Sequence, residues 1–161
     1  MRKYLSLLAA MTFLTLVAMT YQSQAADKVD LEKVPEKVMS AVKTRFPGAE
    51  SISVTKEVEN GDVVYDVELK HKDRKYEMDI KEDGTILEVE KQVDAKDFPA
   101  ACAKAVETKY PKSTVKEIME VNKVKDKVET PDHYEVTIET TEKKSVEVLV
   151  SLKGEIIEET K

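Results

Sequence analysis

The sequence predicts an α+β fold of two tandem α-β-β-β-β repeats, which form an antiparallel sheet with both helices packed on one face. One observation is an internal repeat, because the second half of the chain follows the plan of the first. The other is that in each half apolar residues recur at helical spacing and then alternate with polar ones. The matching positions are Pro35 with Pro99, Ala41-Val42 with Ala105-Val106, Phe46-Pro47 with Tyr110-Pro111, Tyr65 with Tyr134, and Gly84 with Gly154.

The first repeat opens with an amphipathic helix. Its apolar residues fall on one helical stripe. Pro35 stands near the first turn, where its missing N–H costs nothing, and Pro47 ends the helix. The stripe consists of Val34, Val38, Ala41, Val42 and Phe46.

Four strands are expected after this helix. Residues 51–58 alternate in polarity, as do residues 63–70 and 76–81. Asp83-Gly84 is a hairpin signal, so residues 86–90 form the returning strand.

The second repeat keeps this plan. Its helical stripe is Phe98, Cys102, Ala105, Val106 and Tyr110, and strands are expected around Tyr134–Ile138, Val146–Val150 and Ile156–Ile157. Residues 115–124 lack clean alternation, which predicts a bulge or a register shift. Residues 125–132, with Pro131, are expected to form a longer loop.

The N-terminal segment has the features of a secretory signal peptide. Arg2-Lys3 precede an apolar stretch too short to span a bilayer comfortably, and Ser23-Gln24-Ala25 offers a cleavage site. We therefore expect a signal peptide at 1–25, repeats at 26–92 and 93–161, and a periplasmic or secreted mature protein without stable membrane insertion. An uncleaved anchor is the alternative.

Composition excludes several classes of function. The formal charge is −6, and about −8 without Arg2 and Lys3, so a basic footprint for nucleic acid is missing. Aromatic residues are only 6% of the chain, which argues against a stacking platform for sugars or bases. Cys102 is the one cysteine and rules out an internal disulfide.

The sheet face away from the helices is the expected protein-binding face. One apolar face needs the helices as a cover, which leaves the polar side chains of the strands on the other side. Its candidate residues are Asp66, Glu68, Glu77, Asp79, Glu135, Thr137, Glu139, Glu147 and Leu149.

The motifs of the first repeat resemble the PepSY-like group, which shares its architecture with the beta-lactamase inhibitor protein. They are an Ala-Val helix ending in FPGAE, then YDVEL, YEMDI, a DG turn and ILEVE. The resemblance implies an exported, non-enzymatic module that binds or inhibits a protein through its open sheet face. The second repeat departs from the pattern, because it reads PKS where the first reads PGA.

The other candidate residues can each be explained by an ordinary structural role. Cys102 takes the place of Val38 on the apolar stripe, so we expect it in the core, and His71 and His133 are expected at the solvated surface. Tyr65 and Tyr134 fit core packing better than recognition. The carboxylate pairs Asp66/Glu68, Glu77/Asp79 and Glu88/Glu90 are either an ordinary polar strand face or a weak divalent-cation site.

The sequence contains no local motif of a catalytic pair, a phosphate loop or a zinc site. We therefore expect no enzyme activity, no catalytic residue, no bound metal and no cofactor. The favoured hypothesis is a module that binds a protein or peptide, with an acidic cation-binding envelope protein as the alternative.

Overall fold

The computed structural model describes residues 27–59 and 61–160, so the expected signal peptide lies outside the described residues. The element order is helix and four strands, followed again by helix and four strands, with a short strand and a 3₁₀ turn in front. That order fits two repeats, although their common origin stays a prediction. The helices are α1 (Glu36–Arg45) and α2 (Ala100–Lys109), with the 3₁₀ turn η1 (Leu31–Lys33).

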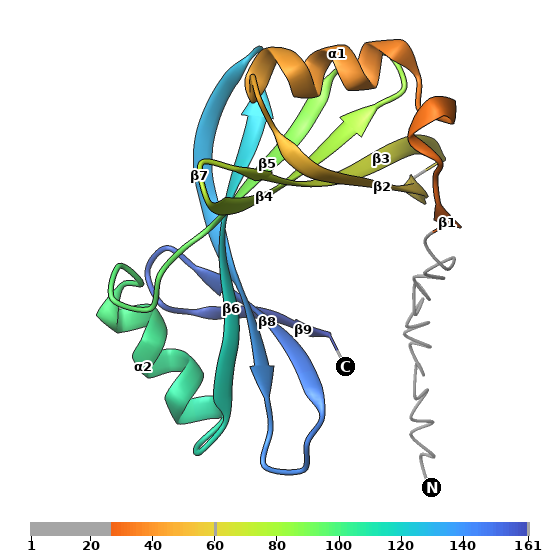
Figure 1. Cartoon of the computed structure of the whole chain (residues 1–161). Coiled ribbons are helices and arrows are strands. Elements are labelled where there is room, and N and C mark those ends of the chain that lie inside the picture. Colours follow the sequence, from red (N-terminus) through yellow and green to blue (C-terminus); the bar gives the residue numbers. More distant parts are fainter. Residues whose placement is uncertain (1–26, 60, 161) are drawn as a thin grey trace, which may run out of the picture.

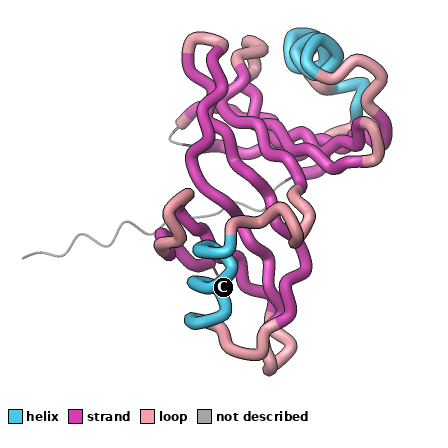
Figure 2. The backbone as a smooth tube through the Cα atoms, turned by 90° about the vertical axis from the view of Figure 1, so that its left-hand side faces the viewer, coloured by secondary structure: helices cyan, strands magenta, loops and turns pink. Residues whose placement is uncertain are grey.

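The described strands form one antiparallel sheet whose spatial order is the order of the sequence, β1 to β9. In Figure 1 the sheet bends between an upper part beneath α1 and a lower part beside α2. Figure 2 shows the two helices at opposite ends of this sheet. The strands are β1 (Asp27–Lys28), β2 (Glu50–Glu59), β3 (Asp62–His71), β4 (Arg74–Lys81), β5 (Ile86–Gln92), β6 (Thr114–Lys125), β7 (Val128–Glu139), β8 (Ser145–Ser151) and β9 (Ile156–Thr160).

Helix α1 buries its apolar stripe against the first four long strands. Val38 and Val42 are fully buried and share a core with Tyr65, Met78 and alternate residues of β2 to β5. The expected packing of Tyr65 is confirmed, because it is 5% exposed within this core. This burial, rather than helix propensity, stabilises so short a helix.

Helix α2 does the same for the second part of the sheet. Cys102 and Val106 pack with Ile118, Val136 and alternate residues of β7 and β8. The expected core position of Cys102 is confirmed, since its side chain is fully buried. Tyr134 packs against the edge of this core, and its ring lies 5.2 Å from that of Phe98.

Two glycine turns bring the hairpins against the helices. Gly84 has a φ of +88°, and a Cβ there would lie 2.9 Å from the carbonyl oxygen of Lys37 in α1. Gly154 has a φ of +85°, and its Cβ would lie 2.8 Å from the carbonyl oxygen of Ala101 in α2. Only glycine satisfies both the backbone angle and the close approach.

The expected loop at 125–132 is wrong. A tight turn at Asp126 and Lys127, both with positive φ, joins β6 directly to β7, which begins at Val128. Strand pairing continues through this region up to Lys125 and Val128. Pro131 is tolerated because it lies beyond the end of β8, on an unpaired side of β7.

The long β6–β7 hairpin therefore links the two parts of the molecule. In Figure 1 it runs from the lower sheet up to the level of α1. Val124 packs against the first core, and Arg45 of α1 binds Glu129 through two hydrogen bonds of 2.8 and 3.1 Å. The irregularity expected in β6 is confirmed by register shifts at Val115/Glu117 and Val121/Asn122.

Candidate functional site

The nine residues expected on the binding face all alternate with core residues along their strands, so they point away from the two cores. Strand pairing brings them together as Asp66 with Asp79, Glu68 with Glu77, Glu135 with Leu149, and Thr137 with Glu147. Their neighbours on the same side come from β4, β5 and β6. We call the acidic face the surface formed by these nine residues and by Lys75, Glu88, Glu90, Glu117, Met119, Val121, Lys123 and His133.

One cross-strand row runs along the acidic face from β2 to β8. Each member is paired with the next by strand register, and the two parts of the molecule meet in its centre, where Glu90 of β5 faces Val121 of β6. Glu68, Glu77 and Glu90 lie directly opposite one another, an arrangement that is unfavourable for like charges. The row is Ser53, Glu68, Glu77, Glu90, Val121, His133 and Ser151.

Lys75 neutralises part of this charge. Its ammonium lies 2.7 Å from Glu77, 3.1 Å from Glu117 and 3.9 Å from Glu68. Desolvation by itself would lower the pKa of Lys75, but the hydrogen bonds to Glu77 and Glu117 outweigh it and raise that pKa. Lys75 thus stays charged and joins β4 to β6 across the face.

A second cation, Lys123, neutralises part of the charge in the neighbouring cross-strand row of Asp66, Asp79 and Glu88. Lys123 donates to Glu88 at 2.5 Å, and Glu88 keeps little of its side chain exposed. In the same row Asp66 accepts a hydrogen bond of 3.1 Å from Thr55. Burial, with a further contribution from Glu77, raises the pKa of Asp66 to about 6.

Glu90 is different from these carboxylates. Among the described residues, no cation lies within ion-pair distance of it and no side chain donates a hydrogen bond to it. Burial, then the charges of Glu135 and Glu77, raise its pKa to about 9. At neutral pH this side chain is therefore mostly protonated.

The expectation that His133 is a solvated surface residue is wrong. Its side chain is only 8% exposed, because β7 places it inside the bend of the sheet beside Val121. Nδ1 lies 2.9 Å from Asp132 and Nε2 lies 3.4 Å from Glu135, so a protonated ring donates to both carboxylates. The hydrogen bond to Glu135, the largest cause, raises the pKa of His133 against the effect of burial.

His71 is also not a freely solvated side chain. It is half-buried at the end of β3, near Phe46 and Tyr76, and its Nδ1 is buried without a hydrogen-bond partner among the described residues. It alternates with the acidic face and lies on the core side of β3.

At the end of the acidic face around Glu139, the carboxylate is paired with lysines. Glu139 is paired with Lys143 at 2.9 Å and with Lys116 at 3.6 Å, on an exposed part of the hairpins. Thr137, Glu147 and Leu149 are half-buried between this end and the central row. The expected site residues therefore line one surface, but only those nearest Glu90 share a desolvated environment.

The central apolar residues of this face were not predicted. Met119 and Val121 are 4% and 0% exposed although they lie on the side away from both cores. The bulges in β6 obscured the alternation that would have marked them. The signal that could have found Glu90 is its spacing from Glu88, which the sequence already placed on one strand face.

The structure gives a metal site no support. Among residues 27–59 and 61–160, no group of three or more His, Cys, Asp or Glu side chains is arranged to hold a metal ion. Within the same part of the chain, no helix is long and apolar enough to cross a membrane.

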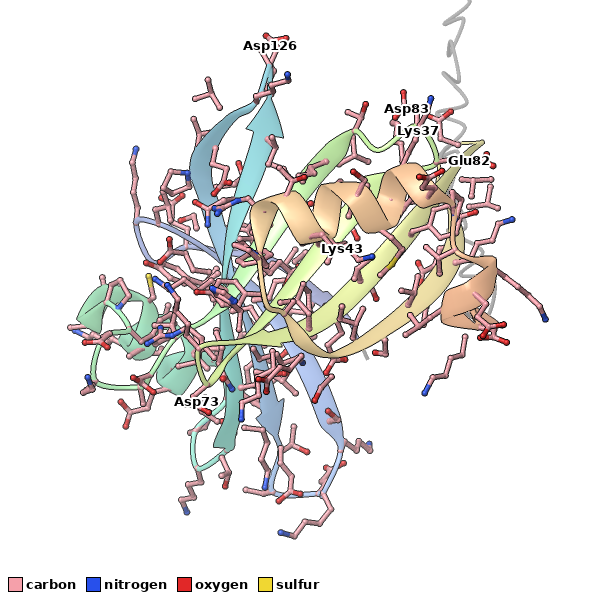
Figure 3. The ribbon with its side chains drawn as sticks, turned by 45° about the horizontal axis from the view of Figure 1, so that its top comes forward. Lys37, Lys43, Asp73, Glu82, Asp83 and Asp126 are labelled. Atoms are coloured by element: carbon pink, nitrogen blue, oxygen red, sulfur yellow. The ribbon has the colours of Figure 1, made fainter. Side chains whose placement is uncertain are left out.

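A groove of about 790 Å³ lies elsewhere, between α1, the β4–β5 turn and the β6–β7 hairpin. Its lining mixes both charges, with Lys37, Arg45 and Lys127 facing Asp83, Asp126 and Glu129. Figure 3 shows Asp126 at the tip of the hairpin and Lys37 beside Asp83 at the β4–β5 turn. Since Arg45 is already bound to Glu129, this groove has no dominant charge to offer a ligand.

Comparison with known proteins now identifies the group to which this architecture belongs. The model of the family described as "Putative beta-lactamase-inhibitor-like, PepSY-like" matches residues 64–158. The model of the "Peptidase propeptide and YPEB domain" matches residues 35–90. No curated protein matches the chain.

Three solved structures share the fold. A "putative periplasmic" protein from Bacteroides eggerthii has a TM-score of 0.62 at 15% identity, over 79% of this chain and 88% of that one. A DUF2874 family protein from Bacteroides uniformis has a TM-score of 0.60 at 16% identity, over 78% and 88%. A BLIP-like protein from Bacteroides fragilis has a TM-score of 0.54 at 20% identity, over 78% and 85%.

These identities establish a common fold and leave binding and activity open. The family match is more informative, because it covers more than half of the sequence and runs from within β3 to within β9, including α2. The chain therefore belongs to the beta-lactamase-inhibitor-like, PepSY-like family.

Proposed function

We propose that this protein is an exported, non-enzymatic module that binds a protein or peptide through the acidic face. The observation that carries the proposal is the cross-strand row through Glu90, which joins both parts of the molecule into one continuous surface. A surface of this kind suits contact with another macromolecule better than with a small molecule, which prefers a concave, mostly apolar pocket.

The strand register supports a free face. Tyr76, Lys91, Glu120, Tyr134 and Val150 form a row on the other side of the sheet. Tyr76 packs against the first core, and Tyr134 and Val150 belong with the second, so both helices cover the same side. The acidic face is then not covered by either helix and lies on the inside of the bend seen in Figure 1, with Met119, Val121 and His133 buried at its centre.

The described chemistry favours binding over catalysis. Cys102 lies in the second core, on the side away from His133, so the two do not form a nucleophile–base pair. Ser151 is opposite His133, but its Oγ accepts from the backbone N–H groups of Lys153 and Glu155, and Nε2 of His133 points to Glu135. The family relationship to inhibitor-like and propeptide domains agrees with this proposal.

Inhibition of an envelope or extracellular enzyme is the specific form of binding that we propose from the similarity to the BLIP-like protein. Export is proposed from the signal peptide and agrees with the "putative periplasmic" relative. Mass spectrometry of the mature protein tests export, with Ala26 as the expected first residue. An intact Met1 would contradict it.

Photo-crosslinking in living cells tests the binding face. A photoreactive residue at Leu149, half-buried within the acidic face, should capture a defined partner, whereas one at Glu107 on the exposed side of α2 should not. The double reversal Glu68→Lys with Glu139→Lys should reduce capture at Leu149. An unchanged crosslinking pattern in that variant would remove the acidic face as the site.

The alternative of a cation-binding envelope protein finds no favourable observation. Glu77, Glu88 and Glu117 are already matched by Lys75 and Lys123. Calorimetry with millimolar calcium should show no binding heat, and a saturable heat would restore the alternative.

A further inference from the structure

We infer that the partner presents a lysine or arginine side chain to the centre of the acidic face, where it pairs with Glu90. This inference rests on the proposed function and specifies the chemistry of the partner at that same site. It is carried by two features of the face, which are the arrangement of its charges and its missing counter-ion.

The arrangement of charges leaves a local excess of carboxylates. Glu68, Glu77 and Glu90 are direct cross-strand neighbours, and Asp66, Asp79 and Glu88 form the adjacent row. Two lysines of the face, Lys75 and Lys123, form ion pairs with carboxylates of these rows. A cationic partner is complementary to what remains, and such complementarity guides both encounter and specificity.

The missing counter-ion is at the centre of the face. Lys75 is held between Glu77 and Glu117, and Lys123 is held by Glu88, so both cations are engaged on either side of Glu90. Glu90 itself has no ion pair among the described residues. A cation supplied from outside would complete the row in the way that Lys75 already does for its neighbours.

The surroundings of Glu90 favour a long cationic side chain over a metal ion. Val121 faces Glu90 across the β5–β6 ladder, and Met119 lies two residues further along β6. Both are buried, so a partner does not contact them and reaches Glu90 with the charged end of a long side chain. A metal ion would instead need several converging ligands, which the described residues do not provide.

Binding of this kind is coupled to a proton. The charged and titratable groups around Glu90 are Glu77 and Asp79 on β4, Glu88 on β5, Lys123 on β6, and His133 and Glu135 on β7. The pKa of Glu90, about 9, keeps its carboxyl protonated in the free protein at neutral pH. An arriving cation favours the ionised form, so binding releases this proton and strengthens as the pH rises from about 6 to 9.

The test uses octalysine as the probe and octaglutamate as its negative counterpart, in isothermal titration calorimetry with the full mature protein. The substitution Glu90→Gln should weaken octalysine binding about fivefold or more, since it removes the carboxylate that the cation is inferred to meet. Glu107→Gln makes the same side-chain change on the exposed face of α2 and should leave the affinity within about twofold.

Titration at pH 7.5 in two buffers of different ionisation enthalpy measures proton release. The wild-type protein should release a proton on binding octalysine, and Glu90→Gln should release markedly less. Equal losses of affinity in Glu90→Gln and Glu107→Gln would show general electrostatic attraction and overturn the inference. Binding of octalysine without proton release would also overturn it.

The crosslinking experiment separates this inference from the proposed function. A partner captured at Leu149 whose affinity is unaffected by Glu90→Gln would refute the cationic contact and leave the binding face intact. Glu90-dependent octalysine binding without any partner at Leu149 in cells would refute the proposed function and uphold the cationic preference of the surface.

Discussion

Glu90 lies directly opposite Glu77 in the β4–β5 ladder, and only Glu77 has a lysine to neutralise it. Lys75 is the partner of Glu77, at 2.7 Å. Burial and the neighbouring carboxylates raise the pKa of Glu90 to about 9, so Glu90 holds a proton at neutral pH. This proton makes the stability of the protein sensitive to pH and to substitution at Glu90.

The substitution Glu90→Gln should stabilise the protein at pH 7. The folded protein raises the pKa of Glu90 from 4.5 to about 9, so the folded state holds a proton that the unfolded state releases above pH 4.5. The free energy of unfolding therefore falls as the pH rises from about 4.5 to 9, and glutamine, which mimics the protonated acid, removes the loss. We expect a gain of about 2 kcal/mol at pH 7 in urea unfolding.

Glu88→Gln is the matched control for this prediction. It lies on the same strand and face but removes the ion pair with Lys123, so it should leave stability unchanged or lower it by about 1 kcal/mol. If Glu90→Gln destabilised the protein as much as Glu88→Gln, the protonated state assigned to Glu90 would be wrong.

His133 should titrate above its ordinary pKa of 6.5. Its hydrogen bonds to Glu135 and Asp132 favour the charged ring, so its contribution to stability is complete below pH 6.5 and is lost as the pH rises through the folded pKa. NMR of the imidazole resonances measures this directly. Glu135→Gln should lower the pKa of His133, whereas Glu107→Gln should not change it, and a wild-type pKa below 6.5 would contradict the geometry.

Alanine at the two glycine turns should be strongly destabilising. In Gly84→Ala and Gly154→Ala the new Cβ meets the helix backbone at 2.9 and 2.8 Å, in addition to the strain of positive φ. We expect losses of about 2–4 kcal/mol in chemical unfolding. Gly48→Ala has the same sign of φ but open space around it, so it should cost only about 1 kcal/mol. Equal costs at all three positions would show that the helix contact is unimportant.

Cys102 should react with thiol reagents only when the protein opens. Its side chain is fully buried between α2 and β8, and burial raises the pKa of the thiol, which suppresses the reactive thiolate. Labelling at pH 8 should therefore be slow in the native protein and rapid in 6 M guanidinium. Fast native labelling would mean that α2 does not cover this position as described.

The sequence predicted the elements well because most of them obey a single period. The stripe of Val38 and Val42 indicates a helix, and the alternation around Tyr65 indicates a strand. The structure places all three residues in one core. The error at residues 125–132 arose because Pro131 and many charged residues are typical of loops. The unpaired outer edges of a long hairpin tolerate the same residues. A single sequence therefore does not distinguish a loop from a hairpin here.

The candidate face was predicted only in outline. Alternation identified the side on which Glu77 and Glu135 lie, but it gave no information on which strands bend toward one another. The burial of His133 and Val121 depends on the curvature of the sheet and on the bulges in β6, both of which arise from contacts between residues far apart in the chain. Local periodicity carries no record of such contacts.

The division of the chain at residues 92 and 93 is a boundary in sequence but not in packing. The β6–β7 hairpin lies in the second half of the sequence, yet its Val124 packs against the first core and its Glu129 binds Arg45. The first half thus lacks a piece that the second supplies, and the molecule should unfold in one cooperative transition rather than in two. Without the β6–β7 hairpin, the first core would lose Val124 and Arg45 would lose its ion-pair partner.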